Sequence, residues 1–146
     1  CPKCRDGWEE FEGQCYYFSN NTSKWEEARE RCQLQGADLV QVSSRKEQEF
    51  LTDRVKQMMR GNNDLFWIGL TDSVTESTWL WVDGSPLEQG FVLTFWHNRE
   101  PNNWDDEDPV RGEDCVRLGD INGNINCWSD RACSHPERSI CEKPEQ

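Results

Sequence analysis

The sequence predicts a single α+β domain, with two helices early in the chain and many short strands after them. Two segments before residue 62 carry helical periodicity behind capping residues, whereas the later apolar runs are short and end in turns. The length of 146 residues fits one domain, residues 1–146, with residues 1–18 as an N-terminal hairpin extension. Eight cysteines between Cys1 and Cys141 predict disulfides and an oxidising, extracellular or lumenal setting.

The charge and hydropathy of the chain exclude several classes of partner. A net charge of −12 at pH 7 repels nucleic acid and anionic membrane surfaces and favours a cation as ligand. No apolar run approaches the roughly 18 residues of a membrane span, so we expect a secreted module or an ectodomain that does not itself insert into a membrane. Asn20 and Asn21 both begin acceptor triplets for N-glycosylation, which agrees with secretion.

The N-terminal residues predict a hairpin. Aromatic residues and turn positions alternate between Trp8 and Phe18, and Cys4 and Cys15 could close the two ends. Cys1 and Cys4 also form a C-x-x-C pair, a spacing found in zinc sites and redox motifs. A zinc site needs a second close pair of ligands and a redox motif needs a strand followed by a helix, so we expect disulfide use instead.

Two helices are predicted from capping boxes followed by apolar stripes. The boxes are Ser23-Lys24-Trp25-Glu26 and Ser44-Arg45-Lys46-Glu47, in each of which a serine hydroxyl and a glutamate satisfy free backbone amides. The first helix ends at Gly36 and the second near Gly61. The buried stripes are Trp25, Ala28 and Cys32 in the first helix, and Phe50, Leu51, Val55, Met58 and Met59 in the second.

The remainder of the chain predicts strands around one long irregular region. Short apolar runs predict strands at residues 39–42, 66–70, 79–82, 115–118, 125–128 and 139–141. Between residues 72 and 114 the pattern is largely irregular. A loop of that length inside a compact domain is uncommon and usually functional.

The acidic stretch from Glu100 to Cys115 predicts a cation site inside this irregular region. It holds seven carboxylates around Arg111, two prolines and a tryptophan, and it ends on a cysteine that a disulfide can fix. Calcium takes six to eight oxygen ligands of this kind at roughly 2.3–2.6 Å. Asp72 and Glu76, four residues apart, are either solvated turn acids or further ligands.

These motifs together resemble the C-type lectin-like domain over essentially the whole chain. The motifs are Trp67-Ile68-Gly69-Leu70, Trp81-Val82-Asp83-Gly84, Glu100-Pro101-Asn102, Gly112-Glu113-Asp114-Cys115 and Trp128-Ser129-Asp130. The resemblance is to the long form of the domain found in type II receptor lectins of the hepatic and dendritic-cell kind. It implies two helices flanking short antiparallel sheets, a long double-back loop, and the disulfides Cys4–Cys15, Cys32–Cys141 and Cys115–Cys133. Cys1 and Cys127 are left unassigned.

The resemblance also implies Ca²⁺ as cofactor, with one principal site and one or two auxiliary sites. The implied ligands of the principal site are Glu100, Asn102, Glu113 and Asp130, with Ser129 in doubt because sugar-binding members carry asparagine there. The implied auxiliary ligands are Asp72, Glu76, Asn103 and Asp114. The implied sugar contacts are Glu100, Asn102, Glu113, Ser129 and Trp104.

The implied function is calcium-dependent binding of glycans on glycoproteins or microbial surfaces. Glu-Pro-Asn is typical of mannose, fucose and N-acetylglucosamine binding, whereas Trp104 and the lengthened loop after it resemble galactose-binding receptors. A calcium-stabilised protein-binding or ice-binding domain that has lost sugar binding is the alternative, and Ser129 favours it. Oligomers could form through a stalk outside these residues or through Cys1 or Cys127. No Ser/His/Asp or Cys/His constellation indicates an enzyme.

Overall fold

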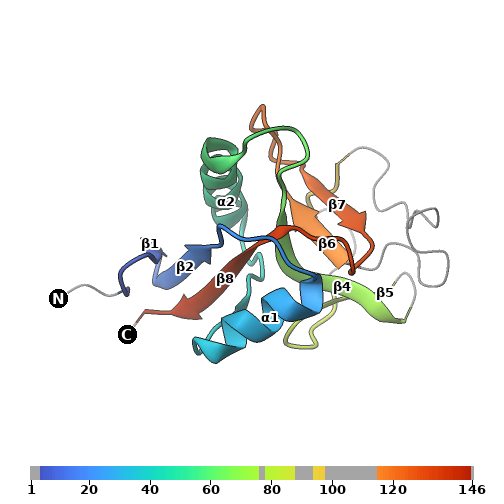
Figure 1. The fold of residues 1–146 in the computed structure, drawn as a ribbon, viewed down its shortest axis with the longest axis horizontal. Coiled ribbons are helices and arrows are strands. Elements are labelled where there is room, and N and C mark those ends of the chain that lie inside the picture. Colours follow the sequence, from blue (N-terminus) through green and yellow to red (C-terminus); the bar gives the residue numbers. More distant parts are fainter. Residues whose placement is uncertain (1–3, 76–77, 88–93, 98–114, 146) are drawn as a thin grey trace.

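The computed structural model describes residues 4–75, 78–87, 94–97 and 115–145, and within them two helices and eight strands form an α+β fold (Figure 1). The elements in chain order are β1 (Glu9–Phe11), β2 (Gln14–Phe18), α1 (Trp25–Leu34), β3 (Asp38–Leu39), α2 (Arg45–Met58), β4 (Phe66–Thr75), β5 (Thr78–Trp81), β6 (Cys115–Leu118), β7 (Trp128–Arg131) and β8 (Arg138–Pro144).

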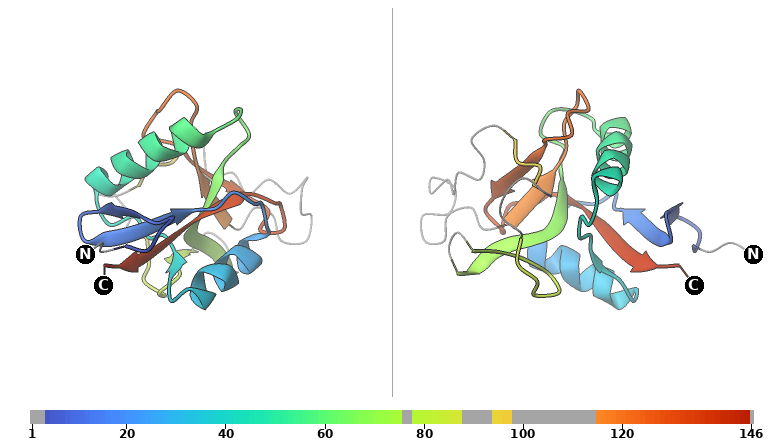
Figure 2. Two further views of the ribbon diagram at one scale, coloured as in Figure 1. Left: turned by 60° about the vertical axis from the view of Figure 1, so that its left-hand side comes forward. Right: turned by 180° about the vertical axis from the view of Figure 1, so that it is seen from behind.

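The strands pair in a continuous order that begins at β1, near the termini, and ends at β7, at the opposite end of the molecule. Their order is β1-β2-β8-β4-β6-β7, with β3 paired to β8 and β5 paired to β4. Only the β4–β8 pair among these is parallel. The helices α1 and α2 lie on opposite sides of β8 in all three views (Figures 1 and 2), and β7 lies on the side away from both termini.

One predicted N-cap is confirmed, although the Glu47 side chain accepts from Ser43 and not from Ser44, and the other cap is displaced by one residue. The hydroxyl of Ser44 accepts the amide of Glu47 at 3.0 Å and caps α2 as expected. Helix α1 is capped by Lys24 instead of Ser23, and the Lys24 amide donates to Glu27 at 3.2 Å. Ser23 is unavailable because its backbone pairs with that of Glu137 at 2.9 and 3.1 Å.

Several predicted strand limits are wrong, including those of β3 and β8, and the differences at β4 and β7 bear on the site. Strand β4 does not end at Leu70 but continues to Thr75, so Asp72 lies in a strand and not in a connection. Strand β7 begins at Trp128, where residues 125–128 were expected. The pairing of Thr75 with Thr78 in β5 sets the first limit, and the pairing of Trp128 with Leu118 in β6 sets the second. The hydropathy of one segment does not reveal its partner.

Tryptophans connect α1 to the sheet through buried hydrogen bonds. The indole of Trp25 donates to the carbonyl of Ile68 at 2.9 Å, and the indole of Trp67 donates to the carbonyl of Ser23 at 2.9 Å. Gly69 lies at the crossing, where a Cβ would approach the Leu39 carbonyl oxygen at 2.8 Å. Any larger residue there would therefore displace the backbone.

The structure contains the three disulfides that the resemblance implies, Cys4–Cys15, Cys32–Cys141 and Cys115–Cys133. Cys127 is unpaired and only 2% exposed, while Cys1 lies outside the described residues. Burial raises the pKa of the Cys127 thiol to about 11, although hydrogen bonds from Thr52 and Gln48 oppose this. Burial and a raised pKa both argue against the expected route to oligomers through Cys127, because the thiolate is the reactive form and must be accessible.

Glu142, which pairs with Tyr16 in the β2–β8 ladder and neighbours Glu47, gives the fold a pH dependence. Tyr16 donates its hydroxyl to Glu47, whose other oxygen accepts the Ser43 amide at 2.7 Å. Burial, followed by the neighbouring Glu47 carboxylate, raises the pKa of Glu142 to about 8. Folding therefore favours the protonated form of Glu142.

The free energy of unfolding is expected to fall between pH 4.5 and pH 8 because of Glu142. A raised folded-state pKa contributes stability that is present below the ordinary glutamate pKa and is lost as the pH rises through the folded value of about 8. Glu142→Gln should flatten this slope in urea unfolding measured with chelator present. The exposed control Glu30→Gln should keep it, and equal slopes for both variants would contradict the assignment.

Candidate functional site

Two deeply buried aspartates lie on either side of β6. Asp130 in β7 is 1% exposed and faces Val116 in the ladder, and Asp72 in β4 is 2% exposed. Asp72 directly follows Thr71, which pairs with Cys115 at the start of β6. Burying an ionised carboxylate is costly unless hydrogen bonds, charges or a metal compensate it, so these positions suit cation ligands.

The position of Asp130 follows from the packing of Trp128. Trp128 is fully buried, its indole donates to Gln48 Oε1 at 3.1 Å, and its ring meets Phe95 edge-on with centroids 5.4 Å apart. Its amide also donates to the Phe95 carbonyl at 2.8 Å, and its carbonyl accepts the His97 amide at 2.8 Å. Because strand side chains alternate between faces, Asp130 points to the same side as Trp128.

The Ser129 side chain points to the opposite face of β7 and is hydrogen-bonded to the Arg117 guanidinium. Its hydroxyl accepts Nε of Arg117 at 3.1 Å, across the β6–β7 ladder. Nη1 of Arg117 donates at 2.8 Å to Glu137, which also contacts Nδ1 of His135 at 2.9 Å. Burial raises the pKa of Glu137, although Arg117 and His135 favour its charged form. Sequence reasoning missed Arg117, and only the strand register reveals its contact with Ser129.

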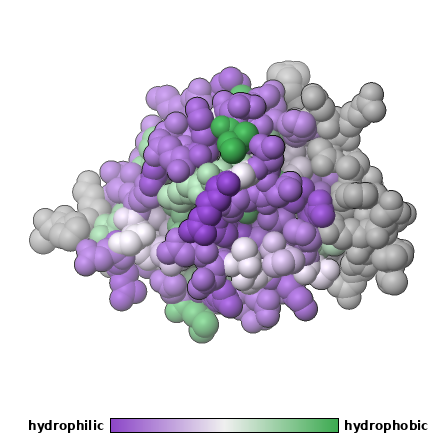
Figure 3. All heavy atoms as spheres, turned by 45° about the horizontal axis from the view of Figure 1, so that its top comes forward, coloured by the Kyte–Doolittle hydropathy of each residue, from purple (hydrophilic) through white to green (hydrophobic). Residues whose placement is uncertain are grey.

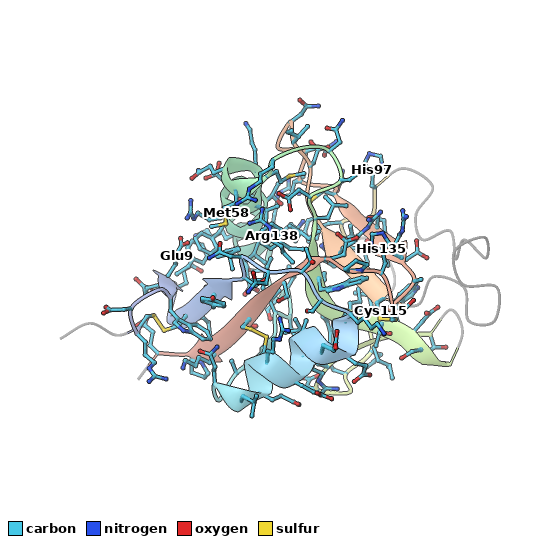
Figure 4. All side chains as sticks on the ribbon, viewed as in Figure 1. Glu9, Met58, His97, Cys115, His135 and Arg138 are labelled. Atoms are coloured by element: carbon cyan, nitrogen blue, oxygen red, sulfur yellow. A yellow bond between two sulfur atoms is a disulfide. The ribbon has the colours of Figure 1, made fainter. Side chains whose placement is uncertain are left out.

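A disulfide fixes the point where the acidic stretch enters the sheet. Cys115 is the first residue of β6, directly after Asp114 in the chain, and it is bonded to Cys133 just beyond β7. The carbonyl of Cys133 accepts the amide of Trp25 at the start of α1 at 3.0 Å. Figure 4 shows Cys115 and His135 on the side of the molecule where β4 and β6 lie. The β6 end of the acidic stretch is therefore tied to both β7 and α1.

The other site residues expected from the sequence lie outside the described residues. They are Glu76, Glu100, Asn102, Asn103, Trp104, Glu113 and Asp114. In the described ranges no group of three or more His, Cys, Asp or Glu side chains could hold a metal ion. The predicted ligand sets therefore stay predictions.

The two histidines do not form an acid–base pair. His97 and His135 lie well apart in Figure 4, and His135 is engaged with Glu137. Within the part of the chain that the structure describes, no helix is long and apolar enough to cross a membrane.

Comparison with known proteins connects this geometry to a family. A family model described as "Lectin C-type domain" matches residues 21–143. This chain belongs to the C-type lectin family. Mouse asialoglycoprotein receptor 1 is 40% identical over 139 residues, which cover 95% of this chain and 44% of the receptor. C-type lectin domain family 4 member M of Symphalangus syndactylus is 37% identical over 144 residues, or 99% of this chain and 30% of that protein.

The solved structures agree with this assignment. The mouse scavenger receptor C-type lectin carbohydrate-recognition domain matches with a TM-score of 0.80 and 35% identity, covering 98% of both chains. A calcium-independent type II antifreeze protein matches with a TM-score of 0.77 at 24% identity, covering 98% of this chain and 95% of that one, and this likeness shows the fold alone. The chain spans about a third of the length of the first curated C-type lectins that it matches.

Proposed function

We propose that this C-type lectin domain binds glycans through calcium, with Glu100, Asn102, Glu113 and Asp130 as principal ligands. The observation that carries the proposal is the Asp130 carboxylate, 1% exposed, on the strand beside β6 and fixed by the buried Trp128. Hard carboxylate and amide oxygens suit calcium. The net charge of −12 gives the domain a long-range attraction for the cation.

The proposed chemistry divides between the ion and the side chains. Bound calcium supplies open coordination positions that two vicinal sugar hydroxyls can fill. Glu100 and Glu113 would accept hydrogen bonds from those hydroxyls, and the Asn102 amide would donate to them. Because each hydroxyl would contact both the ion and a protein side chain, the relative orientation of the two hydroxyls determines which sugar fits. On the Glu-Pro-Asn motif we propose mannose, fucose and N-acetylglucosamine as ligands.

Asp72 belongs to a proposed auxiliary calcium site together with Glu76, Asn103 and Asp114. Its support is that Asp72 lies in β4 with only 2% of its surface exposed, which is unusual for a solvated turn acid. This site would stabilise the long loop that carries the principal ligands. One or two auxiliary ions agree with the number of acids in that region.

A glycan array with and without chelator tests the proposal. We expect binding to mannose-type glycans that free mannose and chelator both abolish. Preference for galactose would instead assign specificity to Trp104, and Glu100→Gln with Asn102→Asp should move a mannose-type domain toward galactose. Binding that no monosaccharide competes would favour a protein-binding or ice-binding domain. The observation in favour of this second candidate is the Ser129 hydroxyl, which already accepts a hydrogen bond from Arg117.

Replacing Ser129 by asparagine is expected to tighten calcium binding by about 5-fold, because the amide oxygen adds one net interaction of roughly 1 kcal/mol. Isothermal titration with calcium measures the change. The register of β7 should not change in this variant, because Trp128 anchors the strand on its opposite face. Unchanged calcium affinity would remove Ser129 from the proposed site.

Glycan retention is expected to weaken below about pH 5.5, because protons compete with calcium for clustered carboxylates. The measurement is elution volume from a mannose column at pH 5 and pH 7.5 with calcium held constant. Equal retention at the two values would contradict carboxylate ligation.

The proposed setting is extracellular, in a secreted protein or the ectodomain of a type II membrane protein. Single monosaccharide sites are weak, so glycans on glycoproteins or microbial surfaces would be bound through several linked domains. The linkage would come from a stalk outside these residues or from Cys1.

A further inference from the structure

Residues 20–22, between β2 and α1, form a short exposed tip, and hydrogen bonds fix the residues on either side of it. Ser19 is anchored by its amide to the Ser139 carbonyl at 2.9 Å and by its hydroxyl to the Ser139 amide at 2.8 Å. Ser23 is anchored to Glu137 by two backbone hydrogen bonds. Residues 20–22 between these anchors are exposed.

This tip carries two overlapping acceptor triplets, and the structure distinguishes them. The triplet of Asn20 ends on Thr22, which is exposed, whereas that of Asn21 ends on Ser23, which is 7% exposed and pinned by its backbone. The modifying enzyme requires the hydroxyl two residues after the asparagine. As the chain folds, Ser23 is withdrawn into the bridge with Glu137, so only the Asn20 triplet keeps both groups accessible.

A hollow of about 250 Å³ adjoins the tip, and both asparagines line it. It is also lined by Tyr17 of β2, by Arg31 and Leu34 in the last turn of α1, and by Gln35 directly after the helix. Leu34 is 86% exposed, the more exposed of two large hydrophobic residues on the described surface. The face drawn in Figure 3 is largely hydrophilic, with only small separate hydrophobic patches.

The chemistry of the hollow matches an amino sugar. A pyranose ring has an apolar face that packs on aliphatic and aromatic side chains, and its hydroxyl and acetamide groups bond to polar side chains at the edge. The hollow is shallow, so a free sugar would bind weakly. A glycan attached at the rim has a high effective concentration and needs little intrinsic affinity.

We propose that Asn20 carries an N-linked glycan whose first N-acetylglucosamine residues lie in this hollow and cover Leu34. The C-terminal end of α1 lies on the side of the molecule where the termini emerge, away from β7 and Asp130 (Figures 1 and 2). The attached glycan therefore leaves the proposed calcium site open.

Site occupancy is tested by secretion from a glycosylating eukaryotic host and intact mass before and after glycosidase. Thr22→Ala destroys the Asn20 triplet and keeps that of Asn21, while Asn21→Gln does the reverse. We expect one glycan on the wild-type chain and on Asn21→Gln, and none on Thr22→Ala. Glycosylation of Thr22→Ala, or an unmodified wild-type chain, would overturn the assignment.

A double-mutant cycle tests whether the glycan packs on Leu34. Leu34→Gln is introduced into the glycosylated wild type and into the unglycosylated Thr22→Ala chain. We expect Leu34→Gln to lower the Tm by about 2–4 °C with the glycan and to change it little without it. Ile121→Gln, the other exposed hydrophobic residue, should behave alike in both backgrounds. Equal effects of Leu34→Gln in both would show that the glycan does not cover this side chain.

Discussion

Replacing Asp130 by asparagine is expected to lower calcium affinity by at least about 100-fold, a loss of about 2.7 kcal/mol. Asp130 is 1% exposed on a strand whose position is fixed by Trp128, so no neighbouring side chain can take its place without moving the core. Asparagine keeps the shape but removes one negative charge from the ligand set, and calcium affinity depends on the number of charged ligands. Glycan retention at millimolar calcium should be lost with it.

The measurement is calcium titration followed by retention on a glycan column. Asp6→Asn changes the net charge equally at an exposed position and should leave both readouts near the wild-type values. Wild-type calcium affinity in a folded Asp130→Asn chain would exclude Asp130 as a ligand.

Local signals in the sequence predicted the helices and most strands. The Ser44 cap and the apolar stripe after it are contained within about fifteen residues, and α2 forms where they indicate. The disulfide partners came from the resemblance, because spacing alone leaves the pairing of eight cysteines open. The cap of α1 was misplaced by one residue because Ser23 has a distant partner, Glu137, that no local pattern reveals.

The ligand types of the candidate site stay predictions, and the surroundings of its described residues were not predictable from local sequence. Asp130 and Asp72 were identified from motif positions, but their burial depends on strands that pair across long stretches of chain. The contact between Arg117 and Ser129 depends on the β6–β7 register, where a shift of one residue would place Arg117 on the other face. The burial of Cys127 likewise comes from α2, through Gln48 and Thr52.

Replacing Arg117 by methionine is expected to destabilise the domain by about 3–5 kcal/mol at pH 7, the usual cost of leaving a buried charge without its partner. The side chain of Glu137 is 3% exposed and that of Arg117 is 12% exposed, so water cannot replace the ion pair. Without Arg117 the pKa of Glu137 should rise further. A raised pKa contributes stability at low pH that is lost as the pH rises, so the destabilisation should shrink toward pH 4.5.

Urea unfolding at pH 7 and pH 5 measures this effect, and Glu137→Gln in the Arg117→Met background should recover most of the loss. Arg117→Lys keeps a cation for Glu137 but has no Nε–H donor for Ser129, so it separates the two contacts of Arg117. If the guanidinium diverts Ser129 from calcium, Ser129→Asn should tighten calcium more in the Arg117→Lys chain than in the wild type. Equal gains in both would mean that Arg117 stabilises the fold without affecting the proposed calcium site.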